Sequence, residues 1–243
     1  MPKNNLKGII HCHSSYSMDS VVSINEIVAF IKKNQLDFVI LSDHDTIKGS
    51  LALQKKVLAH KDLNVQVPVT AEYGTEYGDV IAAFITSEID PKLPFKDFVE
   101  EVRSQGGLLL FPHPFKSHKN IDAIAEQSDL IEVFNSRHPS KYDKLSLDLA
   151  TKYKKNTYWA SDAHLLQDYK LVMLDLESDA TTLKDALLNG RIRPLQTKKS
   201  LQTSLLLSQL IKGIKLMKGQ LIYKTSIRLL KNALKGRLFQ RIT

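Results

Sequence analysis

Short apolar runs alternate with helix-like stretches along most of the chain. Strands are predicted at residues 7–11, 37–41, 65–71, 80–85, 108–111, 130–134 and 157–160. Helices are predicted over residues 47–60, 95–104, 142–155 and 180–188, and another begins at Ser23, which has the spacing of a capping box with Glu26. Alternation of this kind is typical of a mainly parallel sheet or barrel.

Polar and ionisable residues follow the apolar runs directly. The clusters are His11-Cys12-His13, Ser42-Asp43-His44-Asp45, Glu72, His113 and Ser161-Asp162-Ala163-His164. Because the C-terminal ends of the strands of a β/α barrel meet at one rim, we expect these side chains to lie close together. Alternate residues of a strand share a face, so His11 and His13 are expected to reach one ion while Cys12 points away.

Each motif taken singly has an ordinary structural explanation. His11 and His13 would be two partly exposed histidines, Asp43 a solvated carboxylate beside a helix cap, and His113 a core histidine. Taken together the motifs favour metal binding, because burying many ionisable groups is costly unless they are paired or bind metal. Imidazoles and carboxylates without thiolates suit Zn, Mn or Fe, and several carboxylates indicate more than one ion.

In order and spacing these motifs resemble the polymerase-and-histidinol-phosphatase (PHP) family. The resemblance covers residues 7–194 and includes Ser17-x-Asp19 and His113-Pro114 besides the clusters above. It implies an α/β fold, a distorted (β/α)7 barrel with metal ions at the C-terminal rim. It also implies a metal-dependent phosphoesterase, a hydrolase acting on a phosphate ester through a metal-activated water.

The resemblance implies two or three divalent ions (Mn, Zn or Fe), held by a set of imidazoles and carboxylates. The implied ligands are His11, His13 and Asp162 for the first ion, Glu72 as a bridge, His113 for the second, and Asp19, His44 and His164 for the third. Asp79 stands where many members of the family have a further histidine. Asp19 lies one residue later than in the commonest form of its motif.

Arg137 and Asp43 are the candidate catalytic groups. The 131–137 segment resembles one that is common in small stand-alone members of the family. Arg137 is interpreted either as a fork that binds phosphate or as a surface arginine paired with a carboxylate. The substrate would be a nucleotide, an oligonucleotide or a small phosphorylated metabolite. The alternative function is a non-catalytic metal-binding module that acts through its C-terminal tail in membrane or partner binding.

The C-terminal part of the chain differs in composition from the rest. The chain is 43% hydrophobic and 25% charged, as is ordinary for a globular protein, but residues 191–243 contain 13 Lys and Arg and no Asp or Glu. Apolar residues recur there at helical spacing between the basic ones, which predicts one or two basic amphipathic helices. We therefore divide the chain into a barrel at residues 1–194 and a basic helical tail at 195–243.

The sequence of the basic tail is compatible with three binding partners. Its apolar face is interpreted as docking on the barrel or a second subunit, or else as binding an anionic membrane surface. Nucleic acid is less favoured because aromatic residues for base stacking are few. A single cysteine excludes an intrachain disulfide, and residues 1–7 contain no apolar signal core. The expected location is therefore the cytoplasm, at the membrane periphery if the tail binds lipid.

Overall fold

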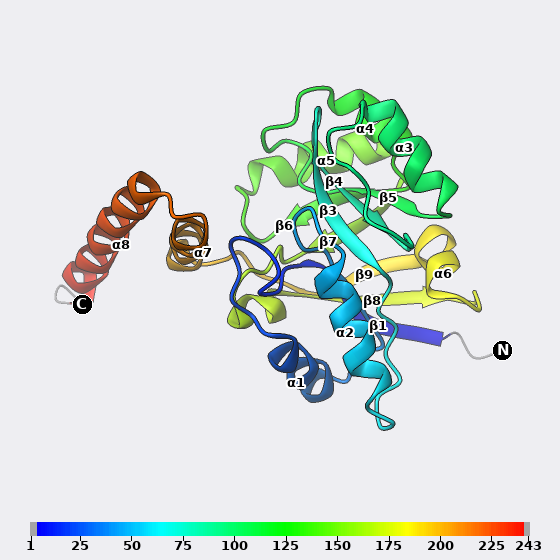
Figure 1. The fold of residues 1–243 in the computed structure, drawn as a ribbon, viewed down its shortest axis with the longest axis horizontal. Helices are drawn as coiled ribbons and strands as arrows, with labels where there is room; N and C mark the ends of the chain where they lie inside the picture. Colours follow the sequence, from blue (N-terminus) through cyan, green and yellow to red (C-terminus); the bar gives the residue numbers. More distant parts are fainter. Residues whose placement is uncertain (1–3, 241–243) are drawn as a thin grey trace.

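Strands and helices alternate along the chain in this computed structural model, which describes residues 4–240 and the side chains of 5–234 (Figure 1). The strands are β1 (Asn4–Cys12), β2 (Phe38–Leu41), β3 (Thr70–Thr75), β4 (Gly78–Ala83), β5 (Leu108–Phe111), β6 (Leu130–Asn135), β7 (Asn156–Ala160), β8 (Val172–Ser178) and β9 (Arg191–Thr197). The helices are α1 (Ile24–Asn34), α2 (Lys48–Leu58), α3 (Phe95–Ser104), α4 (Ile121–Gln127), α5 (Lys141–Lys152), the 3₁₀ helix η1 (Leu166–Leu171), α6 (Leu183–Asn189), α7 (Gln202–Lys215) and α8 (Gly219–Gln240).

The first seven strands form a distorted ring. One sheet has the order β2-β1-β8-β9 and the other β3-β4-β5-β6-β7. Isolated bridges join them at both edges, His44 to Glu72 between β2 and β3, and Cys12 to Ala163 between β1 and the end of β7. Apolar side chains from β1, β2, β4, β5, β6 and β7 pack into one cluster with those of β8, β9 and α6. The predicted α/β fold is confirmed, and the two bridged sheets are consistent with a distorted barrel. The expected mainly parallel pairing is not observed, because β4 and β8 each pair antiparallel with both neighbours.

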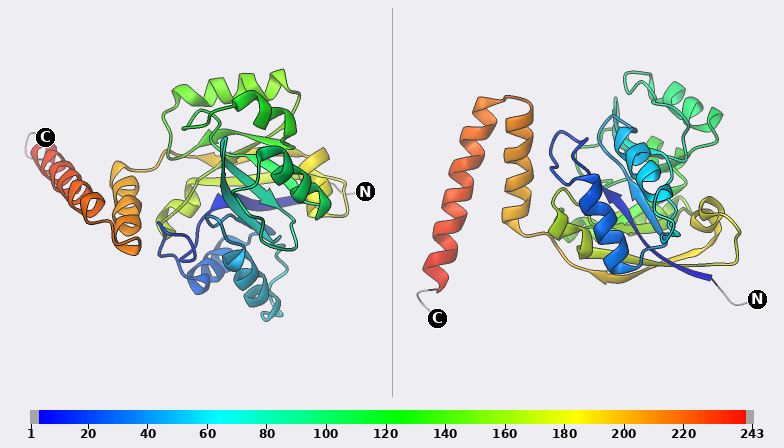
Figure 2. Two further views of the ribbon diagram at one scale, coloured as in Figure 1. Left: turned by 45° about the horizontal axis from the view of Figure 1, so that its top comes forward. Right: turned by 60° about the horizontal axis from the view of Figure 1, so that its bottom comes forward.

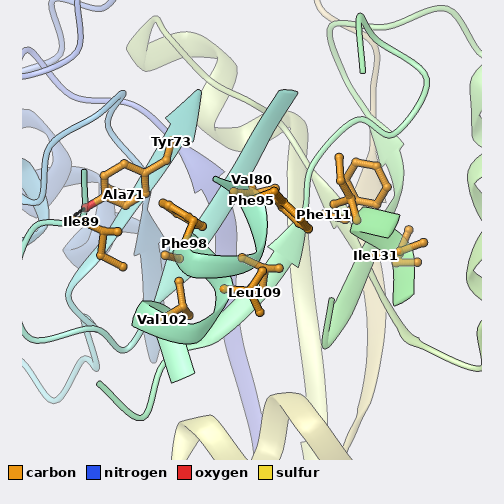
Figure 3. Close-up of a cluster of buried hydrophobic side chains, with 14 of the residues drawn as sticks. Ala71, Tyr73, Val80, Ile89, Phe95, Phe98, Val102, Leu109, Phe111 and Ile131 are labelled. Carbon is orange, nitrogen blue, oxygen red and sulfur yellow. Dashed lines mark hydrogen bonds between the residues drawn. The ribbon is translucent and has the colours of Figure 1, made fainter. Parts of the chain in front are cut away.

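Helices cover the outer face of the strands because their apolar residues recur on one side. In α3 the buried residues are Phe95, Phe98, Val99 and Val102, which have the spacing of one helical face. They pack against Tyr73 and Leu109 of the sheet beneath (Figure 3). A strand such as β5 is buried on both faces and is therefore a continuous apolar run.

The N-terminus of α1 is fixed by the capping box that its sequence predicts. The Ser23 hydroxyl accepts a hydrogen bond from the Glu26 amide, and the Glu26 carboxylate accepts one from the Ser23 amide at 2.8 Å. These two bonds satisfy amide groups that the helix itself leaves without partners. They fix where the chain turns from the loop after β1 into the first helix.

Several predicted elements differ from the structure. The strand expected at 65–71 begins only at Thr70, and Gln66 forms an isolated bridge to Phe38. β4 runs antiparallel to both of its neighbours, because the turn between β3 and β4 is too short for a crossover helix. β8, β9 and α4 were not predicted, since β9 is largely exposed and polar and α4 has no capping side chain.

The basic tail forms two helices, as predicted, and α7 lies between the barrel and α8 (Figure 2). Gly213 permits the close approach of the two helices, because a Cβ atom there would lie 3.0 Å from Ile222 Cγ1. The division of the chain after residue 194 stays a prediction. Within residues 4–240, no helix is both long and apolar enough to cross a membrane.

Replacing Phe98 with alanine is expected to destabilise the barrel strongly. Phe98 is fully buried and its ring packs edge-on against Tyr73 with 5.4 Å between centroids. We expect the Phe98→Ala variant to lose about 3–5 kcal/mol of unfolding free energy in urea titrations. Leu58→Ala is the control, because Leu58 is 79% exposed and its loss should cost about 0.5 kcal/mol or less. Equal losses in the two variants would contradict the packing described.

Candidate metal centre

All the side chains predicted to bind metal converge at one rim of the barrel. Four overlapping groups have ligand atoms within 4.8 Å of one another. They are His13, His44 and His164; His11, His13 and Glu72; His11, His113 and Asp162; and Glu72, Asp79 and His113. Asp19 joins them through its two carboxylate oxygens, which lie 3.2 Å from His164 Nε2 and 3.4 Å from His44 Nε2.

Glu72 lies at the middle of the cluster. Its Oε2 atom is 3.4 Å from His11 Nε2 and 3.3 Å from His13 Nε2. The same oxygen is 3.3 Å from His44 Nδ1, while Oε1 is 3.1 Å from His113 Nε2. One carboxylate therefore contacts four imidazoles from three separate segments, which is the geometry that a bridging ligand needs.

Three residues of the cluster have a strained backbone conformation. His11, His113 and Asp162 have φ angles of 63°, 30° and 50°, a region that non-glycine residues rarely adopt. At His11 the register of β1 against β2 shifts, so the alternation expected for His11 and His13 is interrupted by a bulge. The two rings nevertheless lie 5.3 Å apart between centroids. Strain of about 1–3 kcal/mol per residue is typical of functional sites.

Neighbouring polar groups fix the orientation of the imidazoles. Glu132 Oε2 lies 2.8 Å from His11 Nδ1, and Glu132 Oε1 accepts the His113 amide at 2.9 Å. Ser17 Oγ lies 3.1 Å from His13 Nδ1. In His11 and His13 the opposite ring nitrogen, Nε2, is directed at the centre, as is common for metal-binding histidines. Glu132 was not predicted, although a carboxylate inside the apolar run 130–134 was a signal for it.

Asp43 is buried rather than solvated. Its Oδ1 accepts from the Ser14 amide at 2.6 Å and from Ser17 Oγ at 2.8 Å, and its Oδ2 accepts from Ser14 Oγ at 2.6 Å. Gly49 leaves room for this carboxylate, because a Cβ atom at Gly49 would overlap Asp43 Oδ2. The contacts order the loop that leads from His13 to Asp19. The predicted catalytic role of Asp43 stays a prediction, and its contacts indicate a positioning one.

Arg137 lies at the edge of the cluster. Its Nε atom is 3.6 Å from Asp162 Oδ2, and its Nη2 donates to Ser208 Oγ of α7 at 2.9 Å. Only 12% of the side chain is exposed. His138, four ångströms from Asp162 Oδ2, lies beside it. The side chain is therefore not an open surface arginine, although it does face a carboxylate.

His118 is a further histidine near the centre that the sequence did not single out. Its Nε2 donates to the Asp79 carbonyl at 2.9 Å, and its ring packs 5.6 Å from that of His113 between centroids. Gly78, with φ +126°, lies against the His118 ring, where a Cβ atom would clash. The contact fixes the backbone that carries Asp79.

Opposite charges compensate one another inside the cluster. Burial lowers the pKa of His11, but Glu72, Asp162 and Glu132 raise it well above its usual value. Burial raises the pKa of Glu72, yet His11 and His44 hold it well below its usual range. At the edge of the cluster, burial and the neighbouring Glu72 raise the pKa of Asp79 to about 6. The carboxylates of the cluster thus stabilise positive charge on the imidazoles beside them.

The residues fit a cluster of divalent cations. Among the described residues, His11 Nε2, His13 Nε2, Glu72 Oε2 and Asp19 Oδ1 are buried without a hydrogen-bond partner. Buried polar atoms of this kind are rare unless a ligand or ion satisfies them. The donor set contains imidazole nitrogen and carboxylate oxygen, which suits Zn, Mn or Fe.

Comparison with known proteins gives one family. A model of the family described as PHP domain matches residues 10–207. An uncharacterized protein of Methanocaldococcus jannaschii is 30% identical over 146 residues, covering 55% of this chain and 84% of that protein. A second uncharacterized protein of the same archaeon is 31% identical over 173 residues, covering 66% of each.

Two crystal structures share the fold. A two-domain protein from Bacteroides vulgatus, containing a predicted PHP-like metal-dependent phosphoesterase, has a TM-score of 0.68 and 19% identity over 80% of this chain and 66% of its own. PsfC from Pseudomonas syringae has a TM-score of 0.62 and 15% identity over 88% of this chain and 99% of its own. At these identities the likeness is one of fold. The chain spans less than two thirds of the Bacteroides protein.

Removing divalent metal is expected to destabilise the protein, because buried carboxylates and imidazole lone pairs lose their cation. We expect EDTA to lower the melting temperature by about 5–10 °C, and Mn²⁺ to restore it. Elemental analysis should show at least one ion fewer per chain in His11→Ala. His60→Ala is the control, because His60 lies in the loop after α2 and pairs with Asp62. Equal metal content in both variants would refute the site.

Proposed function

Because the chain belongs to the PHP domain family, we propose that it is a metal-dependent phosphoesterase, a hydrolase that cleaves a phosphate ester. The observation that carries the proposal is the arrangement around Glu72, where buried imidazoles and carboxylates turn unpartnered atoms toward one another. The proposed substrate is a nucleotide, an oligonucleotide or a small phosphorylated metabolite.

We assign two or three Mn, Zn or Fe ions to sets of ligands whose side chains contact one another. By ion, the proposed ligands are His11, His13 and Asp162; Glu72, Asp79 and His113; and Asp19, His44 and His164. Glu72 would be shared, because it belongs to two of the observed groups. When bound, such ions neutralise charge on phosphoryl oxygens and activate water for attack.

Arg137 is proposed to bind the phosphoryl oxygens of the substrate. Its Nη1 atom is buried and has no hydrogen-bond partner among the described residues, although Nε and Nη2 have polar neighbours. A guanidinium already held on two sides offers a donor to phosphate with little further loss of conformational freedom. Asp43 is proposed to act on the 14–17 loop, and Glu132 on His11, so both keep the ligands in place.

The tail has a second proposed role, the binding of an anionic membrane surface. Tyr223, Leu230 and Leu234 of α8 are 68%, 65% and 59% exposed, and Lys224 and Arg228 are exposed beside them. Exposed apolar residues next to basic ones are typical of helices that lie on anionic lipid. A protein partner is the other ligand that such a surface fits, and nucleic acid is less favoured.

Vesicle sedimentation tests the membrane role. We expect the chain to sediment with vesicles that contain phosphatidylserine and to stay in solution with pure phosphatidylcholine. The double variant Lys224→Ala/Arg228→Ala should weaken binding, by about 1 kcal/mol per lost charge. If the chain does not sediment with either vesicle, the membrane role is refuted.

Phosphate release with Mn²⁺ tests the enzymatic function. We would assay a chromogenic monoester, a chromogenic diester and a short oligonucleotide, with His60→Ala as control. His11→Ala and His113→Ala are expected to lose at least about a hundredfold in turnover, since each removes a proposed ligand. The preferred ester would identify the substrate class. Bound metal without turnover of any of the three would instead favour the non-catalytic metal-binding module.

A further inference from the structure

We propose that helix α7 of the basic tail forms one wall of the site that binds the substrate phosphate. In this proposal Lys212 contacts the phosphate directly, and Ser208 positions Arg137. The inference rests on the proposed function, because it assigns the phosphate of the same ester. It differs from the expectation for the tail, which placed an apolar face on the barrel and left the basic face in solvent.

The face of α7 that meets the barrel is polar. Ser204, Ser208, Lys212 and Lys215 follow one another at spacings of four, four and three residues, which place them on one side of a helix. At the start of this face, Ser204 Oγ donates to Asp168 Oδ1 at 3.1 Å. The opposite side packs on α8, as at Gly213 and Ile222.

Lys215 fixes α7 to the loop that carries Asp19. Its Nζ atom donates at 2.7 Å to three backbone carbonyls, those of Ser15, Ser17 and Ser20. These three bonds use all the hydrogens of one ammonium group. The position of α7 relative to the metal-binding rim is therefore set by the same loop that supplies a proposed ligand.

Lys212 lies one turn earlier and faces the rim. Its Nζ atom is 3.8 Å from Asp19 Oδ2, and 39% of its side chain is exposed. That distance exceeds an ordinary hydrogen bond of about 3 Å, so the ammonium is attracted but not fixed. Asp19 is itself proposed to bind metal. A mobile cation at this edge is well placed to reach a phosphate that sits on the ions.

Ser208 lies one turn before Lys212 and holds Arg137. It is 1% exposed, and its Oγ accepts from Arg137 Nη2 at 2.9 Å. On the other side, Arg137 Nε lies 3.6 Å from Asp162 Oδ2. The buried Nη1 atom, which has no partner in the part of the chain described, remains for a ligand. The serine thus positions the guanidinium without contacting the substrate.

The chemistry of these groups identifies the ligand as a phosphate ester carrying negative charge. A guanidinium presents a planar fork that matches phosphate oxygens, and an ammonium adds a point charge that can approach from another direction. The ammonium of Lys212 belongs to this face of α7, and the guanidinium of Arg137 is held by Ser208 on the same face. A neutral substrate would leave these two cations without a counter-charge once Asp19 and Asp162 had bound metal.

Binding of inorganic phosphate to the Mn²⁺-loaded full chain tests the inference by calorimetry. We expect Lys212→Ala to raise the Kd for phosphate about tenfold, and Ser208→Ala about threefold, with unchanged metal content. Lys212→Arg should retain most of the affinity. Lys218→Ala is the matched control, because Lys218 lies exposed in the turn after α7 and should bind phosphate like the parent chain.

Steady-state kinetics with the preferred ester add a second readout. Lys212→Ala should raise KM more than it lowers kcat, because the interaction is with the phosphate in both ground and transition states. Phosphate affinity in Lys212→Ala equal to that in Lys218→Ala, or no phosphate binding by the parent chain, would overturn the inference. If the parent chain binds phosphate through Lys212 but hydrolyses no ester, the inference stands and the proposed function fails.

Discussion

Carboxylates and imidazoles can be buried together only where each charge meets a compensating one, and this constraint governs the rim of the barrel. Glu72 satisfies this constraint by contacting four imidazoles from three segments of the chain. Those segments must therefore arrive with little freedom of position. Left-handed backbone at His11, His113 and Asp162 is the energetic cost of this constraint. At His113 the preceding strand β5 is buried on both faces and holds the backbone in place.

The bridges between the two sheets also hold in position the segments that carry the buried imidazoles and carboxylates. The two sheets are joined by single bridges, and these fall next to the site: His44 pairs with Glu72, and Cys12 pairs with Ala163. Each bridge ties together two segments that carry proposed ligands. The same backbone bridges thus join the two sheets and align the proposed ligands. Without the register shift between β1 and β2, the His11 side chain would point away from the site, since a shift of one residue turns a side chain to the other face of the sheet.

The sequence predicted the convergence of the ligands but not the way in which it is achieved. The ends of two strands, at Phe111 and Ala160, were predicted correctly. Each follows a short apolar run and precedes polar residues, a pattern that reflects burial alone and can be recognised in the local sequence. The bulge at His11 and the antiparallel β4 depend on pairing between distant strands, which no local pattern records. Glu132 was missed for a similar reason, because its partner His11 is 121 residues away in the chain.

The polar face of α7 shows where amphipathic patterns mislead. A helix with apolar and basic sides is ordinarily expected to bury the first and solvate the second. Here α7 packs on a second helix, α8, where Gly213 lies against Ile222. Lys215 and Ser208 on the other side of α7 contact backbone carbonyls and Arg137 at the rim. Residues 1–190 contain 21 Lys and Arg against 26 Asp and Glu, so their net charge is opposite to that of the basic tail. In the proposed function the carboxylates would attract the metal ions, and the tail would contribute cations that an acidic rim cannot supply for an anionic substrate.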